Sequence, residues 1–441
     1  MPRLFLLIAG SFGLAIVFAT PPDGASDEIA QQFKIVRVAS GNPFGADRAL
    51  RLPDIVAWYG PFTDLAMLDT QHRFGKRELR AVLQAPLTCA PVTLAANDAL
   101  AAYGPLSYLP QALAYRASCA AGTSFGAYLH AARIANLVVA LALTAGGIAL
   151  AGSAGWVLFA VALLPATMLQ LASVSGDAML FGLCFALIGL VLAIVGRRLA
   201  PGSGVALICA AGVAIACTKP GYAWLSGIAL VTLPRYRDAG WNWRTLAAWF
   251  IALPVAVQAG VIVLSQGALP VAPGVDSAEQ MRLLRTDVTH FLQQLAHVPA
   301  AWPLRTQWSV LDTLIGLPVW MDTRLSEGLS VALAGGLALA MLMSREPGLT
   351  GRMRTWLALL ACLSVVLVAL PLYLFATPTA NEAIFGLQGR YFTPTLAILL
   401  SAGPLRLPRP VSVLLAPILV AIPCIALPQA VQLVRWRYFG S

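Results

Sequence analysis

The chain has 441 residues, of which 59% are hydrophobic and 11% are charged, whereas soluble domains average about 45–50% apolar and about 25% charged residues. A water-soluble fold is therefore excluded, because no such fold could hide that much apolar surface. The net charge of +10 does not indicate nucleic-acid binding, since the arginines stand in short clusters between apolar runs, as topology signals do.

Eleven apolar runs predict membrane-crossing helices, because a helix of about 20 apolar residues spans the hydrocarbon layer. The first, at about 4–20, has the composition of a signal peptide, but Pro21 and Pro22 argue against cleavage and favour a retained helix. The other runs lie at about 133–150, 155–172, 178–196, 203–218, 221–233, 246–265, 327–343, 355–376, 390–403 and 410–429. We therefore expect an all-α polytopic membrane protein with about 11 transmembrane helices.

The stretch Leu100–Ala121 is also apolar, but it carries Pro105, Pro110 and Arg116. Short loops rich in Lys and Arg stay in the cytoplasm. Five basic clusters share one side only if this stretch does not cross: Arg3, Arg197–Arg198, Arg235–Arg244, Arg345–Arg354 and Arg406–Arg409. We therefore predict an interfacial or re-entrant helix on the outer surface, with its tyrosines in the headgroup zone.

The resulting map is a single membrane domain over residues 1–441, in a bacterial inner membrane, with a cytoplasmic N-terminus. Two extracytoplasmic loops are expected, at 21–132 and 266–326, the first with interfacial helices. Short outer turns follow at three places: Ser173–Asp177, Lys219–Gly221 and Thr377–Gly389. The map also puts Arg435–Arg437 outside, against the charge rule.

The seven cysteines form no CxxC pair and no cluster at zinc spacing, so the sequence indicates neither a redox motif nor a metal site. Five lie in apolar runs and are interpreted as small core residues. Cys89 and Cys119 fall in the first loop, where an oxidising compartment would permit a disulfide. Free buried thiols are the default interpretation for this pair.

The first loop opens with an acidic segment, in which Ser26 or Asp27 can cap a short helix that runs to Ser40 and stops at Gly41. Its apolar face is predicted to lie on the membrane surface and holds Ile29, Phe33 and Val36. Three polar residues share another face: Asp27, Gln31 and Lys34. Two interpretations stay open for Asp27 and Glu28, one as complements of the helix dipole and the other as chemical groups.

Asp177 stands at the outer junction of two apolar helices. A carboxylate there is expected to face protein or a polar cavity, since facing lipid is costly. Capping of the next helix is the structural interpretation. We favour a functional role, because ionisable groups at the membrane edge usually mark a site.

Two basic residues lie in outer turns, Lys219 and, within Gln388-Gly389-Arg390-Tyr391-Phe392, Arg390. Both have a bland interpretation as snorkelling anchors. An Arg at a helix N-terminus, however, is better explained if an anion binds there. Carboxylates and cations at headgroup depth suit a lipid-linked phosphate, with a carboxylate as general base and cations stabilising the departing phosphate.

Five segments spread over nearly the whole chain carry a family resemblance: Pro21-Pro22-Asp23 with Asp27-Glu28-x-Ala30, Tyr103 to Pro110, Leu164-Pro165 with Ser175-x-Asp177, Lys219-Pro220-x-Tyr222, and Gln388 to Pro394. In this order and spacing they resemble the bacterial polytopic family catalogued as domain of unknown function 2142. That family is grouped with glycosyltransferases of the GT-C type, which share a multi-helix core and a first extracytoplasmic loop with a catalytic acid.

The resemblance implies transfer of a sugar, with inversion, from a polyprenyl-phosphate donor to a cell-surface glycan or lipid acceptor. It assigns the catalytic acids to Asp27, Glu28 and Asp177, and donor-phosphate binding to Lys219, Arg390 and Gln388. Supporting roles fall to Asp23, Lys34, Tyr103, Tyr222 and Tyr391. No cofactor is implied with certainty, and a requirement for a divalent cation stays open.

One departure concerns Gln31, because the family commonly has Asp-Glu-Pro-Ala-His where this chain has Asp27-Glu28-Ile29-Ala30-Gln31. The missing imidazole argues against a metal-binding or proton-transfer role at this position, and it leaves the carboxylate hypothesis intact. It also keeps open a non-catalytic subunit of envelope assembly. A transporter or flippase for polyprenyl-linked lipid or glycan is a further alternative, although no inverted repeat or midplane charge is evident.

Overall fold

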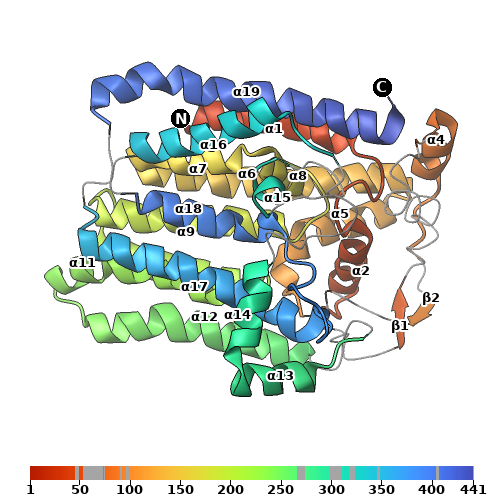
Figure 1. Ribbon diagram of the computed structural model, residues 1–441. Helices are drawn as coiled ribbons and strands as arrows, with labels where there is room; N and C mark the ends of the chain where they lie inside the picture. The colour runs from red at the N-terminus through yellow and green to blue at the C-terminus, as the bar shows by residue number, and fades with distance from the viewer. Residues whose placement is uncertain are drawn as a thin grey trace.

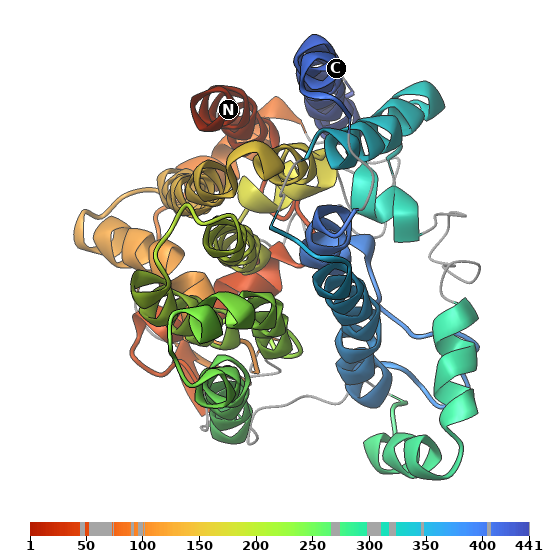
Figure 2. The same ribbon diagram turned by 90° about the vertical axis from the view of Figure 1, so that its left-hand side faces the viewer.

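The long helices of the computed structural model lie side by side in one bundle, which Figure 1 shows from the side and Figure 2 along its length. The structure describes residues 1–44, 49–52, 73, 75–89, 92–95, 100, 102–265, 274–297, 310–316, 323–344, 348–403 and 407–440. Within these ranges, each of the eleven apolar runs predicted from the sequence falls on helical segments.

Six of these segments are long and apolar enough to cross a membrane: α1 (Pro2–Ala19), α6 with α7 (Phe125–Ala151 and Gly155–Ala162), α9 (Asp177–Val195), α12 (Trp243–Ser265), α17 (Gly351–Ala376) and α19 (Arg409–Phe439). Two apolar helices are shorter, α10 (Pro201–Ala216) and α16 (Glu327–Met343). The remaining runs form α8 (Pro165–Leu171), η3 (Ala223–Thr232), α11 (Leu233–Asp238), η5 (Gly389–Phe392) and α18 (Thr393–Ser401). The chain is thus a helical membrane protein, as predicted.

The outer helices of the bundle expose large apolar side chains. Leu7 on α1, Val331 on α16 and Leu414 on α19 are 66%, 71% and 75% exposed. Such side chains are stable on a surface that lipid covers, because lipid removes them from water. The exposed faces of α1, α16 and α19 are therefore lipid-facing surfaces.

The central helix α9 packs directly on α6. A Cβ atom added to Gly189 would lie 2.2 Å from the carbonyl oxygen of Gly147, so the two backbones touch where glycine leaves room. Small residues allow this close approach between membrane helices. The contact fixes α9, whose first residue is Asp177, against a long neighbour.

The helices and strands of the first loop gather at one end of the bundle, on the right in Figure 1, and those of the second loop lie nearer the middle of the view. The first loop forms α2 (Glu28–Ala39), α4 (Lys76–Gln84), η1 (Pro105–Tyr108), α5 (Leu109–Ala120) and an antiparallel pair of strands, β1 (Ala49–Leu52) and β2 (Val92–Ala95). The second loop forms α13 (Ser277–Thr286), α14 (Val288–His297) and α15 (Val310–Ile315).

The stretch Leu100–Ala121 folds as η1 and the 12-residue α5, which is too short to span a bilayer. This agrees with the predicted non-crossing helix. Its tyrosines, however, do not face a headgroup zone. Tyr108 and Tyr115 are 0% and 6% exposed, because they pack against α2 and α6 inside the protein.

Basic residues of three predicted clusters gather at the opposite end of the bundle. Arg198 donates to the carbonyl oxygens of Ala151 and Leu192, Arg235 to that of Val195, and Arg354 to that of Ala402. These carbonyls lie in the last turns of helices, where the helix dipole favours positive charge. These charge clusters and the helices of the first loop therefore lie at different ends (Figure 1).

Cys89 and Cys119 form a disulfide, which links the segment after α4 to the end of α5. The default interpretation of free buried thiols was wrong for this pair. Folding brings the two residues together because the segment from Leu87 to Phe125 loops back on itself, with backbone hydrogen bonds from Leu87 to Thr123 and from Phe125 to Ala85.

The C-terminal end of α19 returns to the first loop. The Tyr438 hydroxyl donates to the carbonyl oxygen of Gly24 at 2.9 Å, and Arg437 is 2% exposed. The charge rule concerns solvated loops, whereas Arg437 is enclosed by protein. Burial therefore sets Arg437 apart from the solvated residues that the rule describes, whereas Arg435 is exposed.

Candidate functional site

Four charged residues from four separate segments form one continuous series of contacts, here called the site ion-pair chain: Asp27, Arg390, Asp177 and Lys219. Arg390 Nη2 pairs with Asp27 Oδ2, and Arg390 Nε lies 3.7 Å from Asp177 Oδ2. Lys219 Nζ lies 2.9 Å from Asp177 Oδ1. All four were predicted as site residues, and the fold brings them together.

Asp27 occupies the position before α2 with a left-handed backbone, φ 63°. Asp tolerates this conformation better than most residues, and such strain persists where the surroundings fix it. The prediction that its side chain caps α2 was wrong, because the carboxylate turns to Arg390 instead. The Asp27 side chain is 40% exposed, so it is the accessible end of the site ion-pair chain.

Asp177 is held by a rigid turn between α8 and α9. Its backbone N–H donates to the Ser175 hydroxyl at 3.2 Å. The amide of Asn136, on α6, donates to the carbonyl oxygens of Ser173 and Ser175, both at 2.9 Å. Asp177 is 4% exposed, so its carboxylate is fixed between the two cations.

Lys219 follows α10 and lies between two aromatic rings. Its Nζ is 3.9 Å from the ring centre of Tyr391 and 5.1 Å from that of Tyr103, a geometry that stabilises an ammonium ion. Burial disfavours the charge, but Asp177 and the neighbouring tyrosines outweigh burial and raise the Lys219 pKa well above its usual value. The amine is therefore a cation.

Tyr103 reaches Lys219 because its neighbour is glycine. The N–H of Gly104 donates to the carbonyl oxygen of Thr218 at 2.5 Å. A Cβ atom at position 104 would lie 2.0 Å from the carbonyl oxygen of Cys217. The first loop thus docks directly on the turn that carries Lys219.

Arg390 lies in η5 and is 5% exposed. Its Nη1 donates to Gln170 Oε1 at 3.3 Å. Two contacts hold its turn in place: the Tyr222 hydroxyl donates to the Tyr391 carbonyl oxygen at 2.8 Å, and the Gly389 N–H donates to the Thr313 hydroxyl at 2.7 Å. The second loop therefore contributes to the site through α15.

Gln388, also predicted to bind phosphate, contributes its backbone carbonyl to the N–H of Tyr391 at 3.1 Å. Its side chain makes no hydrogen bond to the site ion-pair chain within the described ranges. The structure therefore places Gln388 beside the site through the backbone of its turn.

Glu28 does not join the site ion-pair chain, although it follows Asp27 directly. It is 0% exposed and accepts from Arg133 Nε at 2.9 Å and from Nη2 at 2.7 Å. Arg133 also donates to the carbonyl oxygens of Thr20 and Pro21, at 2.6 and 2.9 Å. This enclosed pair joins the end of α1 to α2 and α6, so Glu28 holds the fold together.

Asp23 lies in the turn before α2, and Lys34 lies in the middle of that helix. Asp23 is buried and accepts from the Ile29 N–H at 3.3 Å. Burial raises the pKa of Asp23 well above its usual value, and the nearby Glu28 charge raises it further. Lys34 is also buried and donates to the Pro43 carbonyl oxygen at 2.8 Å.

The prediction that the apolar face of α2 lies on the membrane surface was wrong. Val36 is 0% exposed and packs in a protein core with Tyr108 and Tyr128. The first loop folds over α2 from both sides, so polar and apolar residues alike are buried. Gln31, Lys34 and Asp27 consequently contact three different parts of the protein.

Gln31 connects α2 to the turn that carries Asp177. Its Oε1 accepts from the Tyr108 hydroxyl at 2.5 Å and from the Gly176 N–H at 3.2 Å.

Sequence reasoning missed Gln170 and Arg133 as structural partners of the site. Both are polar residues inside apolar runs, which is the signal that could have identified them.

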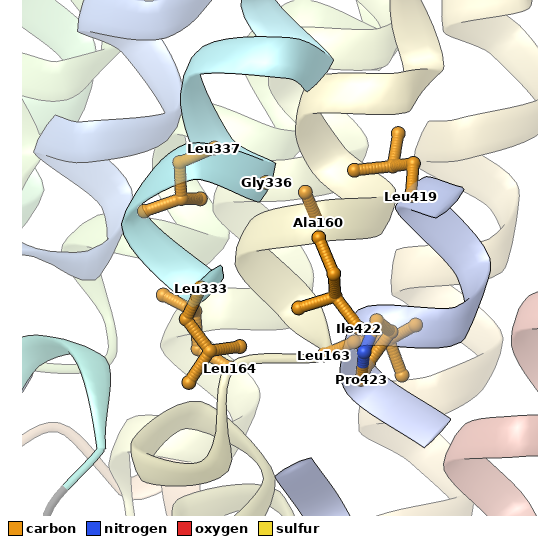
Figure 3. Close-up of a pocket in the computed structure, with 9 residues that line it drawn as sticks. All are labelled: Ala160, Leu163, Leu164, Leu333, Gly336, Leu337, Leu419, Ile422 and Pro423. Carbon is orange, nitrogen blue, oxygen red and sulfur yellow. The ribbon is translucent and has the colours of Figure 1, made fainter. Parts of the chain in front are cut away.

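The described residues also line an apolar cavity between α7, α16 and α19, away from the charged residues (Figure 3). Its walls are Ala160, Leu163, Leu164, Leu333, Gly336, Leu337, Leu419, Ile422 and Pro423. Leu164 directly precedes α8, and Gln170 lies six residues further on, about 9 Å along a helix. Helix α8 therefore connects the apolar cavity to the polar site.

Within the described part of the chain, no three His, Cys, Asp or Glu residues gather as metal ligands would. The profile of the family described as "Predicted membrane protein (DUF2142)" matches residues 11–400. The match contains the whole site ion-pair chain. No curated protein and no solved structure matches the chain.

Proposed function

The chain belongs to the DUF2142 family of predicted membrane proteins, and we propose that it is a membrane glycosyltransferase of GT-C type. It would transfer a sugar from a polyprenyl-phosphate donor to a glycan or lipid acceptor outside the cytoplasm. The observation that carries this proposal is the site ion-pair chain, which presents one accessible carboxylate beside two buried cations.

The proposed reaction is a single displacement. Asp27 takes the proton of an acceptor hydroxyl, whose oxygen forms the new bond to the anomeric carbon while the bond from that carbon to the phosphate oxygen breaks. Arg390 and Lys219 stabilise the departing polyprenyl phosphate. Asp177 holds both cations in place. One displacement inverts the anomeric centre.

One further feature supports a site outside the cytoplasm, because the Cys89–Cys119 disulfide suits an oxidising compartment such as the periplasm. In this proposal about eleven helical runs lie within an inner membrane, which the six long segments cross in full, and the loop helices face the periplasm.

The test uses purified full-length protein in lipid vesicles with a panel of radiolabelled polyprenyl-phosphate sugars and a membrane glycolipid extract as acceptor. We expect a new glycosidic product, and a rate lowered about 10²–10⁴-fold by Asp27→Asn, the range for losing a general base. Glu279→Gln is the matched control, because Glu279 pairs with Arg282 on the surface of α13.

Full activity in the double variant Asp27→Asn, Asp177→Asn would overturn the proposed site. Label that crosses the bilayer without a new glycosidic bond would identify a transporter instead. Transfer that requires a second protein would identify an assembly subunit.

A further inference from the structure

We infer that Asp27 and the donor phosphate compete for the same nitrogens of Arg390, so that phosphate binding releases the Asp27 carboxylate. This inference rests on the proposed function and describes how its site is controlled. A carboxylate and a phosphate both match the planar guanidinium fork. Asp27 thus acts as a latch that only a ligand with an anionic group opens.

The contacts of Arg390 leave one position to exchange. Nη1 is engaged by Gln170, which also accepts from the Ser175 hydroxyl at 2.8 Å. Nε is buried and makes no hydrogen bond in the described structure, although Asp177 lies 3.7 Å away. Nη2 is engaged by Asp27. A phosphate that replaces Asp27 can bond Nη2 and Nε together.

The partners of Arg390 differ in how readily they move. Asp177 is 4% exposed and is held by Lys219 at 2.9 Å. The Asp27 side chain is 40% exposed, and within the described ranges it forms an ion pair with Arg390. An anion that approaches from outside meets Asp27 first, and Asp27 gives way by rotation of its side chain.

The exchange of partners at Arg390 also determines when the Asp27 carboxylate is free to act as a base. While the carboxylate bonds Arg390, Oδ2 cannot accept a proton from an acceptor hydroxyl. After the phosphate takes the guanidinium, both carboxylate oxygens are available. The carboxylate is therefore fully released from Arg390 only when a donor is bound.

The test measures binding of farnesyl phosphate to the purified protein in lipid nanodiscs by calorimetry. Asp27→Asn removes the competing charge but keeps a residue that tolerates the left-handed backbone. We expect it to tighten binding about fivefold, the upper range for a partly exposed ion pair. Arg390→Gln is expected to weaken binding at least tenfold, and Glu279→Gln to leave it unchanged.

Weaker or unchanged binding in Asp27→Asn would overturn the latch, since Asp27 would then be a support for Arg390. Asp27→Ser, which also lacks the charge, is the second variant if the first does not fold. Farnesol shows whether the hydrocarbon part of the ligand binds without a phosphate, and inorganic phosphate shows whether a free anion binds. Binding of inorganic phosphate as tight as that of farnesyl phosphate would exclude a lipid ligand.

The two proposals fail differently. Tighter binding in Asp27→Asn without any sugar transfer by the wild type would preserve the latch and refute the glycosyltransferase. Transfer by the wild type with weaker binding in Asp27→Asn would preserve the enzyme and refute the latch.

Discussion

Asp27 and Glu28 are neighbours in the sequence, yet they belong to two different regions. Glu28 and Arg133 are both enclosed, and their charged atoms are joined by two hydrogen bonds at 2.9 and 2.7 Å. Asp27 is 40% exposed and meets a guanidinium whose Nε makes no hydrogen bond. One pair is saturated, whereas the other leaves bonding capacity unused.

Backbone geometry explains the separation. Asp27 lies before α2 with a left-handed backbone, whereas Glu28 is the first residue of the helix, so their side chains leave in different directions. A saturated buried pair resists exchange, because either partner alone would be an uncompensated charge. An incompletely bonded pair at the edge can change partners. The difference indicates that acidity in a motif does not by itself identify the reactive group.

Breaking the saturated pair is expected to have the largest effect. Glu28→Gln leaves Arg133 buried without a counter-charge, which costs about 3–5 kcal/mol in the free energy of unfolding. The unfolding temperature in detergent, monitored by size-exclusion chromatography of heated samples, measures this loss. Asp27→Asn is the matched comparison and should change stability by less than about 1 kcal/mol, because its pair is partly exposed. Equal losses would remove the distinction between the two regions.

Asp23 gives a second, smaller test of the enclosed region through pH. Its pKa is raised by burial and by Glu28, so the folded state holds the proton more tightly than the unfolded state. Stability must then fall as pH rises from the unfolded value, about 3.9, to the folded value. One such group contributes at most about 1.4 kcal/mol per pH unit.

Asp23→Asn should flatten this fall, since an amide also accepts a hydrogen bond from Ile29 but does not ionise. Unfolding temperatures between pH 4 and pH 8 measure the slope. An unchanged slope in the variant would show that the carboxyl of Asp23 is not enclosed. Glu279→Gln, at an exposed position on α13, is the control.

Much of the helical framework could be predicted from the sequence, because apolar runs must become helices in lipid. The short helix from Glu28 to Ala39 was also predictable, since Gly41 takes the left-handed conformation that ends it, φ 79°. The burial of α2 was not predictable. It depends on the first loop folding over it, and a single sequence does not record which distant segments cover a helix.

The site residues were recognisable by type and motif, but their pairing was not. The sequence does not specify which cations meet Asp27 and Glu28, and the fold pairs Asp27 with Arg390 and Glu28 with Arg133. Gln170 was missed because its role depends on a turn 220 residues away, at Arg390. Long-range contacts of this kind follow from topology, which local patterns do not specify.

Tyr103 gives the test with the smallest expected effect, because it contacts Lys219 of the site ion-pair chain and not the enclosed pair of Glu28 and Arg133. Its ring lies 5.1 Å from Lys219 Nζ and contributes about 0.5–1 kcal/mol to an ammonium ion. Tyr103→Leu should therefore weaken farnesyl phosphate binding about two- to fivefold, with no loss of thermal stability. Tyr103→Phe keeps the ring and should bind as the wild type does.

If Tyr103→Phe weakens binding as much as Tyr103→Leu does, the hydroxyl rather than the ring acts on the site. If Tyr103→Leu instead lowers the unfolding temperature as Glu28→Gln does, Tyr103 belongs to the enclosed region, and the division between the two regions fails.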